Sequence, residues 1–435
     1  MSPFELGIVA ILLVFLLVAA RMPVAFVMLV VGMGGYAYLI SLEAALSIAS
    51  SSIYNTFASY SLIVVPLFVW MGYIAYHAGI SRRIYDATYK VVGRLPAGLA
   101  LATIGASTAF GAICGSTTAT AATMSAVAVP EMKRYKYDRS LATSVVASSA
   151  ILGVMIPPSV IFIIYGIATG ESIAKLFLAG IIPGILLMGL FMLVTWIRAV
   201  RNPTLAPAGP EVDLKGKIRA VAKGGIEVII IFFVVIGGLF LGYFTPTEAG
   251  GVGVAAPLAV AIIRRQLDWT GFKNSLRDSI RISAMIMFLV AAATVFGRFL
   301  AVTNIPTTMA VWAGDLPIHP VAVLAIILLI YLLLGCFIDA LALILLTIPI
   351  FYPVAVHLGF DPIWFGVIIV LVVGMGVITP PVGANVYVVA GIVKDTPVVT
   401  IFRGVWPYLL SIILCIAILT LFPQLALFLP DLIQR

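Results

Sequence analysis

Long apolar runs separated by short polar loops fill most of this 435-residue chain. A bilayer core about 30 Å thick requires about 20 apolar residues per spanning helix, and many of the runs approach that length. The pattern therefore predicts a protein built of membrane-spanning helices. We expect single helices near residues 4–20, 23–41, 59–77, 173–197, 225–241, 247–263, 280–302 and 405–428.

Four further apolar segments are interrupted. Segments 139–168 and 362–391 each contain a Pro-Pro pair, and proline breaks a helix because it lacks a backbone N–H and clashes with the preceding turn. Segments 97–130 and 320–356 are too long for one crossing and carry a polar break near the middle. We expect two broken helices and two re-entrant hairpins, each hairpin entering and leaving on one side of the membrane.

The second half of the chain repeats the first at an offset of 223 residues. The matched positions are Gly153 with Gly376, Ile156-Pro157-Pro158-Ser159 with Thr379-Pro380-Pro381-Val382, Pro130 with Pro353, and Tyr137-Asp138 with Phe360-Asp361. These are mostly Gly, Pro and Asp rather than common apolar residues, which disfavours chance similarity. The chain crosses the membrane an odd number of times between equivalent points of the two halves. The halves must therefore have opposite orientations in the membrane. We therefore expect a first inverted repeat at 1–197, a cytoplasmic linker at 198–224 and a second inverted repeat at 225–435.

Composition and charge restrict the class of protein and its orientation. Charged residues make up 10% of the chain, against about 25% in soluble domains, so a soluble protein is excluded. With both hairpins re-entrant, all but three of the 25 Lys and Arg residues fall on one side. By the positive-inside rule that side is cytoplasmic and both termini are periplasmic. The net charge of +8 thus lies in short loops, and no nucleic-acid partner is expected. The basic, partly amphipathic stretch 81–96 is expected to lie along the membrane surface.

The hairpin tips carry the candidate chemistry. Secondary transporters place midplane sites at broken helices of inverted repeats, where freed backbone carbonyls line a protein-enclosed cavity and can coordinate a cation such as sodium. The first tip, Gly111–Thr120, offers the hydroxyl of Ser116; such hydroxyls can also bond to their own helix. The second tip runs from Gly335 to Asp339. A lone carboxylate at membrane depth is a functional candidate; it acts either as a cation ligand or as a brace for the hairpin.

Five residues are candidate substrate contacts: Thr117, Thr118, Ser159, Asn385 and Arg298. Arginine grips carboxylates through two parallel bonds, although Arg298 could equally extend to the outer interface or form a structural ion pair. Asn385 could bind solute or form an interhelical bond. The chain shows no nucleotide-binding loop, no paired nucleophile and base, and no metal-binding cluster. It is therefore not expected to be an enzyme, and an ion gradient should supply the energy for transport.

The chain resembles, along essentially its whole length, the large membrane subunit of tripartite ATP-independent periplasmic (TRAP) transporters. The residues that carry the resemblance are Gly111 to Thr120, Pro130-Glu131-Met132, Gly153 to Ser159, Tyr165-Gly166, Thr245-Pro246-Thr247-Glu248, Gly335 with Asp339, Pro349, Gly359-Phe360-Asp361-Pro362, Phe365-Gly366, and Thr379-Pro380-Pro381-Val382-Gly383. The resemblance implies an all-α polytopic fold of the elevator type in the bacterial cytoplasmic (inner) membrane.

The resemblance also implies a function. It implies uptake of a small carboxylate coupled to two or more sodium ions, with a small four-helix membrane subunit and a periplasmic substrate-binding protein as partners. The implied first sodium site is Ser116, Gly153, Ile156 and Pro158. The implied second site is Asp339, Gly376, Thr379 and Pro381, beside Gly335. Cys114 replaces the first serine of the family's usual Ser-Gly-Ser tip. The alternative is a stand-alone ion-coupled carboxylate carrier or antiporter of related inverted-repeat architecture.

Overall fold

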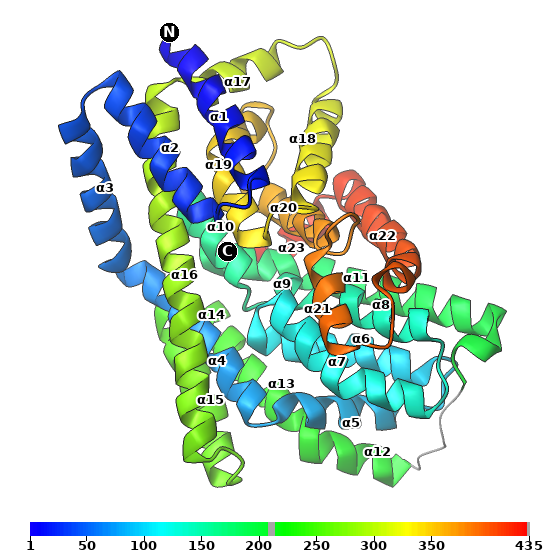
Figure 1. Cartoon of the computed structure of the whole chain (residues 1–435). Helices are drawn as coiled ribbons and strands as arrows, with labels where there is room; N and C mark the ends of the chain where they lie inside the picture. The colour runs from blue at the N-terminus through cyan, green and yellow to red at the C-terminus, as the bar shows by residue number, and fades with distance from the viewer. Residues whose placement is uncertain (208–213, 433–435) are drawn as a thin grey trace.

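The computed structural model describes residues 1–207 and 214–432 (Figure 1), and every regular element in these ranges is helical. The first half contains α1 (Pro3–Ala19), α2 (Val24–Leu39), α3 (Leu42–Phe57), η1 (Tyr60–Ile63), α4 (Val64–His77), α5 (Ile80–Val92), α6 (Gly98–Cys114), α7 (Thr117–Arg134), α8 (Arg139–Ser149), α9 (Leu152–Met155), α10 (Val160–Thr169) and α11 (Ile173–Arg201). After η2 (Pro203–Leu205), the second half contains α12 (Leu214–Ala220), η3 (Val221–Gly225), α13 (Ile226–Phe232), η4 (Phe233–Gly237), α14 (Gly238–Phe240), α15 (Pro246–Ile263), α16 (Trp269–Val302), α17 (Ile305–Gly314), α18 (Pro320–Gly335), α19 (Ala340–His357), α20 (Pro362–Gly376), α21 (Ala384–Ile392), α22 (Val398–Leu421) and α23 (Gln424–Leu432).

The helices of the two halves follow the same order at an offset of 223 residues. Adding 223 to the bounds of α7 gives 340–357, the bounds of α19. By the same shift α5 corresponds to α17, α8–α9 to α20, α10 to α21 and α11 to α22. The third helix differs: α3 and α4 are separate in the first half, whereas their counterpart α16 is continuous. Residues 208–213 of the expected linker and the basic residue Arg435 lie outside the described ranges.

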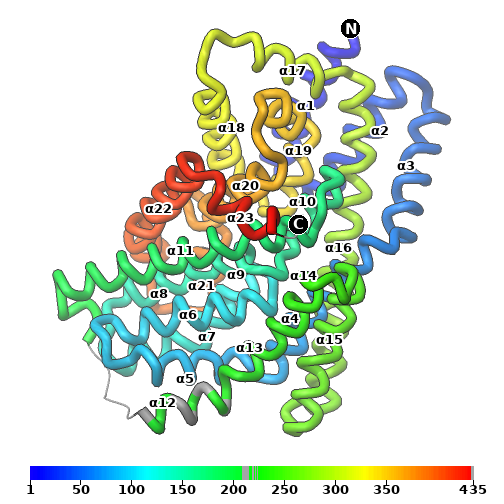
Figure 2. The backbone as a smooth tube through the Cα atoms, turned by 180° about the vertical axis from the view of Figure 1, so that it is seen from behind, coloured from blue at the N-terminus to red at the C-terminus, as the bar shows by residue number. Residues whose placement is uncertain are grey.

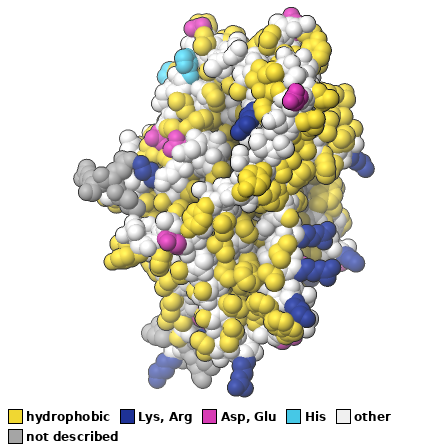
Figure 3. All heavy atoms as spheres, turned by 90° about the vertical axis from the view of Figure 1, so that its left-hand side faces the viewer, with side chains coloured by type: hydrophobic (Ala, Val, Ile, Leu, Met, Phe, Trp, Pro, Cys, Tyr) yellow, Lys and Arg dark blue, Asp and Glu magenta, His cyan; other side chains and the backbone are white. Residues whose placement is uncertain are grey.

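The chain is an all-α polytopic membrane protein. Six of the described helices are long and apolar enough to cross a membrane, and the bent pair α8–α9 and α10, with an angle of 43° at the break, makes a seventh. Hydrophobic side chains cover most of the face shown in Figure 3, and most of the Lys and Arg side chains visible there lie in its lower half. That distribution suits a lipid-facing surface with one strongly basic end.

Some helix boundaries differ from the sequence prediction. The sequence analysis placed no helix between 41 and 59, which is wrong, because α3 fills that segment; its many Ser, Thr and Asn residues lower the apolar density that the prediction relied on. The predicted helix 280–302 is the second part of α16, which begins eleven residues earlier with a polar stretch capped by Asp268. Helix α17 was also missed, and the predicted helix 405–428 is two helices, of which α23 lies across α11 (Figure 2).

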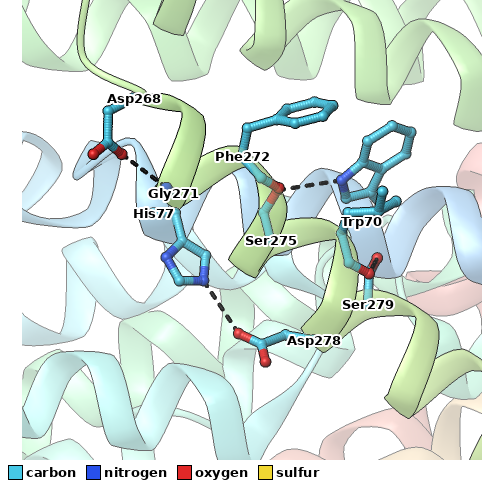
Figure 4. A network of polar contacts seen from close by, with 9 residues as sticks. Trp70, His77, Asp268, Gly271, Phe272, Ser275, Asp278 and Ser279 are labelled. Carbon is cyan, nitrogen blue, oxygen red and sulfur yellow. Dashed lines mark hydrogen bonds and ion pairs between the residues drawn. The ribbon is translucent and has the colours of Figure 1, made fainter.

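Helices α1–α4, α15 and α16 pack together as an outer frame. Helix α16 lies along α2, α3 and α4, while α15 lies along α4. Polar contacts fix α4 to α16 (Figure 4): His77 Nε2 lies 3.2 Å from Asp278 Oδ2, and the Trp70 indole N–H donates to Ser275 Oγ at 3.4 Å. Because these bonds replace the water that the polar groups lose, they hold the frame in one register.

Helix α5 leads from the frame to the first hairpin. The segment expected along the membrane surface packs its apolar face against α6 and the π-helical turn η3. Residues Ile84 and Tyr85 are fully buried there. The buried carboxylate of Glu227 on α13 pairs with both Arg83 on α5 and Arg264 at the end of α15. Helix α5 is thus held by protein contacts that connect it to both halves.

The remaining long helices form an inner group around the two broken helices. This inner group consists of α6–α11 and α18–α22. At its centre the two broken helices are in contact at Ile151 and Gly374. A methyl group added to Gly374 would lie only 2.6 Å from Ile151 Cγ2. These two residues are repeat equivalents, 223 positions apart, as expected where an axis relating the halves passes. The Tyr165 hydroxyl donates to the Pro362 carbonyl at 2.7 Å and adds a second connection between the halves.

Pairs of glycines bring each hairpin into backbone contact with its broken helix. A methyl group on Gly153 in α9 would lie 2.9 Å from Gly111 Cα in α6, and one on Gly376 in α20 would lie 2.8 Å from Gly335 Cα in α18. Such distances are too short for a carbon contact. The absence of side chains at these positions is therefore what allows the helices to cross so closely.

We expect Gly153→Ala to lower the free energy of unfolding by roughly 1–3 kcal/mol, the usual cost of overfilling a packed interior. Thermal unfolding in detergent measures it. Gly189→Ala is the matched control, because a methyl group there meets nothing within 4 Å in helix α11 and alanine favours a helix over glycine. Equal unfolding temperatures for the two variants would contradict the glycine contact.

Candidate ion and substrate sites

The first hairpin turns within two residues. Gly115 ends α6 with a φ of +62°, a conformation that glycine adopts without strain. Ser116 then caps α7, its Oγ accepting the Ala119 N–H at 3.4 Å. A cap of this kind satisfies one of the free amides at a helix start. The tip thus has an ordered backbone and an oxygen-bearing side chain at its apex.

This tip lies directly on the first Pro-Pro break. A methyl group on Gly115 would lie 2.9 Å from the Pro158 carbonyl oxygen, and one on Gly153 would lie 3.6 Å from the Ser116 carbonyl oxygen. The structure therefore brings three of the four residues expected at the first sodium site together. Ile156 ends α9 in an extended conformation immediately before the break, so its carbonyl is not part of a continuing helix.

The second tip repeats the plan with different side chains. Asp339 caps α19, with Oδ2 accepting the Leu341 N–H at 3.1 Å, in the place that Ser116 holds 223 residues earlier. This geometry matches the bracing role that the sequence analysis set beside cation binding. Thr379 follows the end of α20 and its hydroxyl donates to the Met375 carbonyl at 2.7 Å. The peptide bonds Pro157-Pro158 and Pro380-Pro381 are both cis.

The repeat equivalents Asp138 and Asp361 cap the two broken helices. Asp138 Oδ1 accepts the Leu141 N–H and Asp361 Oδ1 accepts the Trp364 N–H, each at 2.9 Å. Both lie at the starts of helices rather than at the tips. Each satisfies a free amide at the start of its broken helix.

The candidate substrate contacts fall into three groups. Thr117 and Thr118 lie at the first tip, where the Thr118 hydroxyl is 3.2 Å from Ser116 Oγ. Ser159 and Asn385 are fully buried. Ser159 caps α10, and the Asn385 amide donates to the Ala147 carbonyl at 3.3 Å, which is the interhelical bond considered in the sequence analysis.

Arg298 is not brought together with the tips. It is an exposed residue of the frame helix α16. The preceding residue, Gly297, faces α19: a methyl group added to Gly297 would lie 3.7 Å from Pro349 Cγ. Pro349 is ten residues beyond Asp339 in α19, or about 15 Å along the helix. This position favours the interpretation in which Arg298 extends to an interface.

The sequence analysis assigned no individual role to Gly72, Thr120 or Glu227. Gly72 in frame helix α4 touches the first tip, since a methyl group there would lie 2.8 Å from Cys114 Cα and 3.3 Å from its sulfur. Thr120, one turn into α7, is fully buried with an unpartnered hydroxyl. Glu227 pairs with two arginines, as described above. Only Thr120 had a sequence signal, its i+4 spacing from Ser116; the other two roles depend on tertiary contacts.

An ion pair links the distal ends of the first hairpin and the second broken helix. Lys133 Nζ lies 2.6 Å from Asp395 Oδ1, and the Arg139 guanidinium donates to the Asp395 carbonyl at 3.3 Å. The hydrogen bond from Lys133 holds the pKa of Asp395 below its usual range. The pair is largely solvent-exposed, so it contributes little to stability.

The residues at the two tips fit sodium better than a transition metal. No group of three or more His, Cys, Asp or Glu residues that could hold a metal ion occurs in the described parts of the chain. The groups present are backbone carbonyls, hydroxyls and one carboxylate, the oxygen ligands that hard cations prefer. At the first tip, the buried Thr120 hydroxyl is an oxygen without a hydrogen-bond partner among the described residues.

Comparison with known proteins identifies the family. The model of the tripartite ATP-independent periplasmic transporter, DctM component, matches residues 11–425. A C4-dicarboxylate TRAP transporter large permease protein of Pseudomonas aeruginosa is 33% identical over 87% of this chain and 88% of its own length. A sialic acid TRAP transporter large permease protein of Vibrio cholerae is 33% identical over 96% of both chains.

Solved structures agree on the fold. The YdaH transporter of Alcanivorax borkumensis has a TM-score of 0.60 at 15% identity and covers 89% of both chains. MtrF of Neisseria gonorrhoeae has a TM-score of 0.60 at 12% identity, and the match covers 98% of this chain and 95% of MtrF.

The sequence relatives are permeases rather than enzymes. A tripartite family implies two further components, a small membrane subunit and a periplasmic binding protein. The chain therefore belongs to the DctM family of TRAP transporter large permeases and is a multi-pass protein of the bacterial inner membrane.

Proposed function

We propose that this chain is the permease subunit of a sodium-coupled, binding-protein-dependent secondary transporter that imports a small organic acid by an elevator movement. The observation that carries the proposal is the double contact between tips and breaks. Each hairpin tip lies on a Pro-Pro-broken helix, through Gly111 and Gly153 in one half and Gly335 and Gly376 in the other. Irregular backbone in a membrane protein is tolerated where it lines a cavity or a site.

Two sets of oxygens would hold the coupling ions. In the first, Ser116 contributes its oxygens, and Gly153, Ile156 and Pro158 contribute carbonyls. In the second, Asp339 contributes its carboxylate, and Gly376, Thr379 and Pro381 contribute carbonyls, beside Gly335. Bound sodium would supply positive charge at both tips. Only the second set contains a carboxylate, so the two sites should differ in affinity.

The substrate is proposed to be a small carboxylate that reaches the first tip. Thr117 and Thr118 begin α7 there, and a helix start presents free amides and a positive dipole end to anions. Three of the relatives are named as permeases for C4-dicarboxylate, sialic acid and 2,3-diketo-L-gulonate, and another for isethionate. The first three are carboxylic acids.

The elevator movement would carry the inner group past the outer frame. The inner group is bound internally by the two glycine contacts and by the crossing at Ile151 and Gly374. Its first tip meets the frame through Gly72 and Cys114, a contact between small groups that can part without leaving a buried charge unpaired. Helices α5 and α17, at equivalent places in the repeat, would connect the two bodies.

The orientation and the partners follow from the same account. We propose that both termini lie in the periplasm, in line with the distribution of Lys and Arg and the positive-inside rule. A small four-helix membrane subunit would accompany the frame, and a periplasmic binding protein would deliver the carboxylate.

We expect uptake in proteoliposomes that contain the small subunit, with the binding protein and its ligand outside, to depend on an inward sodium gradient. Dissipating the gradient should reduce accumulation by at least about tenfold, because the gradient is the proposed energy source. Equal accumulation with and without the gradient would refute the coupling. Omitting the binding protein separates the alternatives: undiminished uptake without it would favour a stand-alone carrier.

We expect Asp339→Asn to raise the sodium concentration for half-maximal uptake by about tenfold, equivalent to ~1.4 kcal/mol, with little change in unfolding temperature. Asparagine caps helices as well as aspartate does, so the change removes charge and keeps the cap. Asp361→Asn is the matched control, since Asp361 caps α20 away from the tips. An unchanged sodium requirement in Asp339→Asn would restrict Asp339 to bracing the hairpin.

A further inference from the structure

Thr120 presents a buried oxygen that no protein group uses. Its side chain is 0% exposed, and its hydroxyl has no hydrogen-bond partner in the described part of the chain. Thr120 lies four residues after Ser116 in α7, so both side chains are on the same face of the helix. That face carries the apex of the first tip.

The orientation of this hydroxyl differs from that of two buried threonines in the first arm of the same hairpin, Thr103 and Thr108. Threonine in a membrane helix commonly donates to the carbonyl four residues earlier; Thr103 and Thr108 in α6 do so, each at 2.8 Å. The corresponding carbonyl for Thr120 belongs to Ser116 and accepts the Thr120 backbone N–H at 3.2 Å. The Thr120 hydroxyl oxygen instead lies 3.0 Å from the point where a methyl group on Gly153 would be.

That point lies between the hairpin tip and the first broken helix. It is 2.9 Å from Gly111 Cα and 3.6 Å from the Ser116 carbonyl oxygen. The hydroxyl therefore packs against Gly153 at this crossing. It lies beside Gly153 and the Ser116 carbonyl, two groups proposed for the first sodium site.

The repeat gives this hydroxyl a specific meaning. At the offset of 223, Ser116 and Thr120 correspond to Asp339 and Leu343. The second tip thus has a carboxylate followed one turn later by an apolar side chain. The first tip lacks a carboxylate and has hydroxyls at both positions, while Cys114 provides no hydroxyl.

We propose that Thr120 Oγ1 is an additional ligand of the first sodium site and that two neutral hydroxyls there take the place of the single carboxylate at the second. The inference rests on the proposed sodium coupling. A buried hydroxyl without a partner costs free energy. An oxygen is also the ligand type that a hard cation requires, so the cation offsets that cost.

The test is thermal unfolding of the purified full-length chain titrated with sodium chloride, with choline chloride keeping the ionic strength constant. In choline, Thr120→Val should unfold at the same temperature as the wild type or higher, because valine removes an unpartnered polar group of similar size. In sodium it should need about tenfold more cation for half-maximal stabilisation. Thr120→Ser, which keeps the oxygen, should titrate like the wild type.

Thr108→Val is the matched control in the same hairpin. The Thr108 hydroxyl is already bonded to Ile104, so this variant should lose stability equally in choline and in sodium, with the sodium midpoint unchanged. Repeating the titrations in an Asp339→Asn background, in which the second tip has lost its charge, isolates the first site. Thr120→Ala takes the place of the valine variant if that protein does not fold.

The outcomes separate this inference from the function on which it rests. If the wild type gains no stability from sodium over choline, sodium binding itself is refuted and the ligand with it. If the wild type is stabilised and Thr120→Val titrates identically, only the role of Thr120 is overturned. A valine variant that loses the same stability in choline and in sodium would assign Thr120 a structural role and also overturn it.

Discussion

The close crossing of two glycine pairs is the constraint on which the rest of the structure depends. Gly111 meets Gly153 and Gly335 meets Gly376 at distances that admit no side chain. These contacts hold each hairpin against its Pro-Pro-broken helix, which is where the proposed ion sites combine carbonyls of the break with oxygens of the tip. In hydrocarbon those carbonyls would each cost several kcal/mol if left unsatisfied. The first break is enclosed by protein in this way, whereas Pro381 and Val382 of the second break are exposed.

The repeat gives the two hairpin tips equivalent positions in the fold but different side chains. Ser116 and Asp339 are both helix caps at equivalent positions, so a helix-capping requirement fixes an oxygen-bearing side chain at each tip. A serine satisfies that requirement with a neutral group and an aspartate with a charged one. An ion at the second tip would thus be held by net charge, and one at the first by preorganised neutral oxygens. Two such sites would respond differently to sodium concentration while moving in one body.

Sequence reasoning succeeded where single residues determine the local backbone. The Pro-Pro breaks lie where the sequence placed them, and the first hairpin turns within the expected tip Gly111–Thr120, because proline and glycine constrain the chain whatever surrounds them. Helix α3 was missed because its polar residues hide a helix that packs on α16. The contact between Gly72 and Cys114 and the pairing of Glu227 could not be read from sequence either. They join segments that only the fold brings together.

The central claim is that the inner group moves as a body past the frame, and Gly72 offers the most direct test. A cysteine introduced there would lie next to Cys114, because its Cβ position is 3.3 Å from the Cys114 sulfur. That position is also 2.8 Å from Cys114 Cα, so the two helices must separate slightly for the disulfide to form. Uptake by oxidised Gly72→Cys should be abolished and should return on reduction. Gly72→Cys with Cys114→Ala has the same crowding without a bridge, and oxidation should not affect its uptake. Full uptake by the verified cross-linked protein would contradict the account.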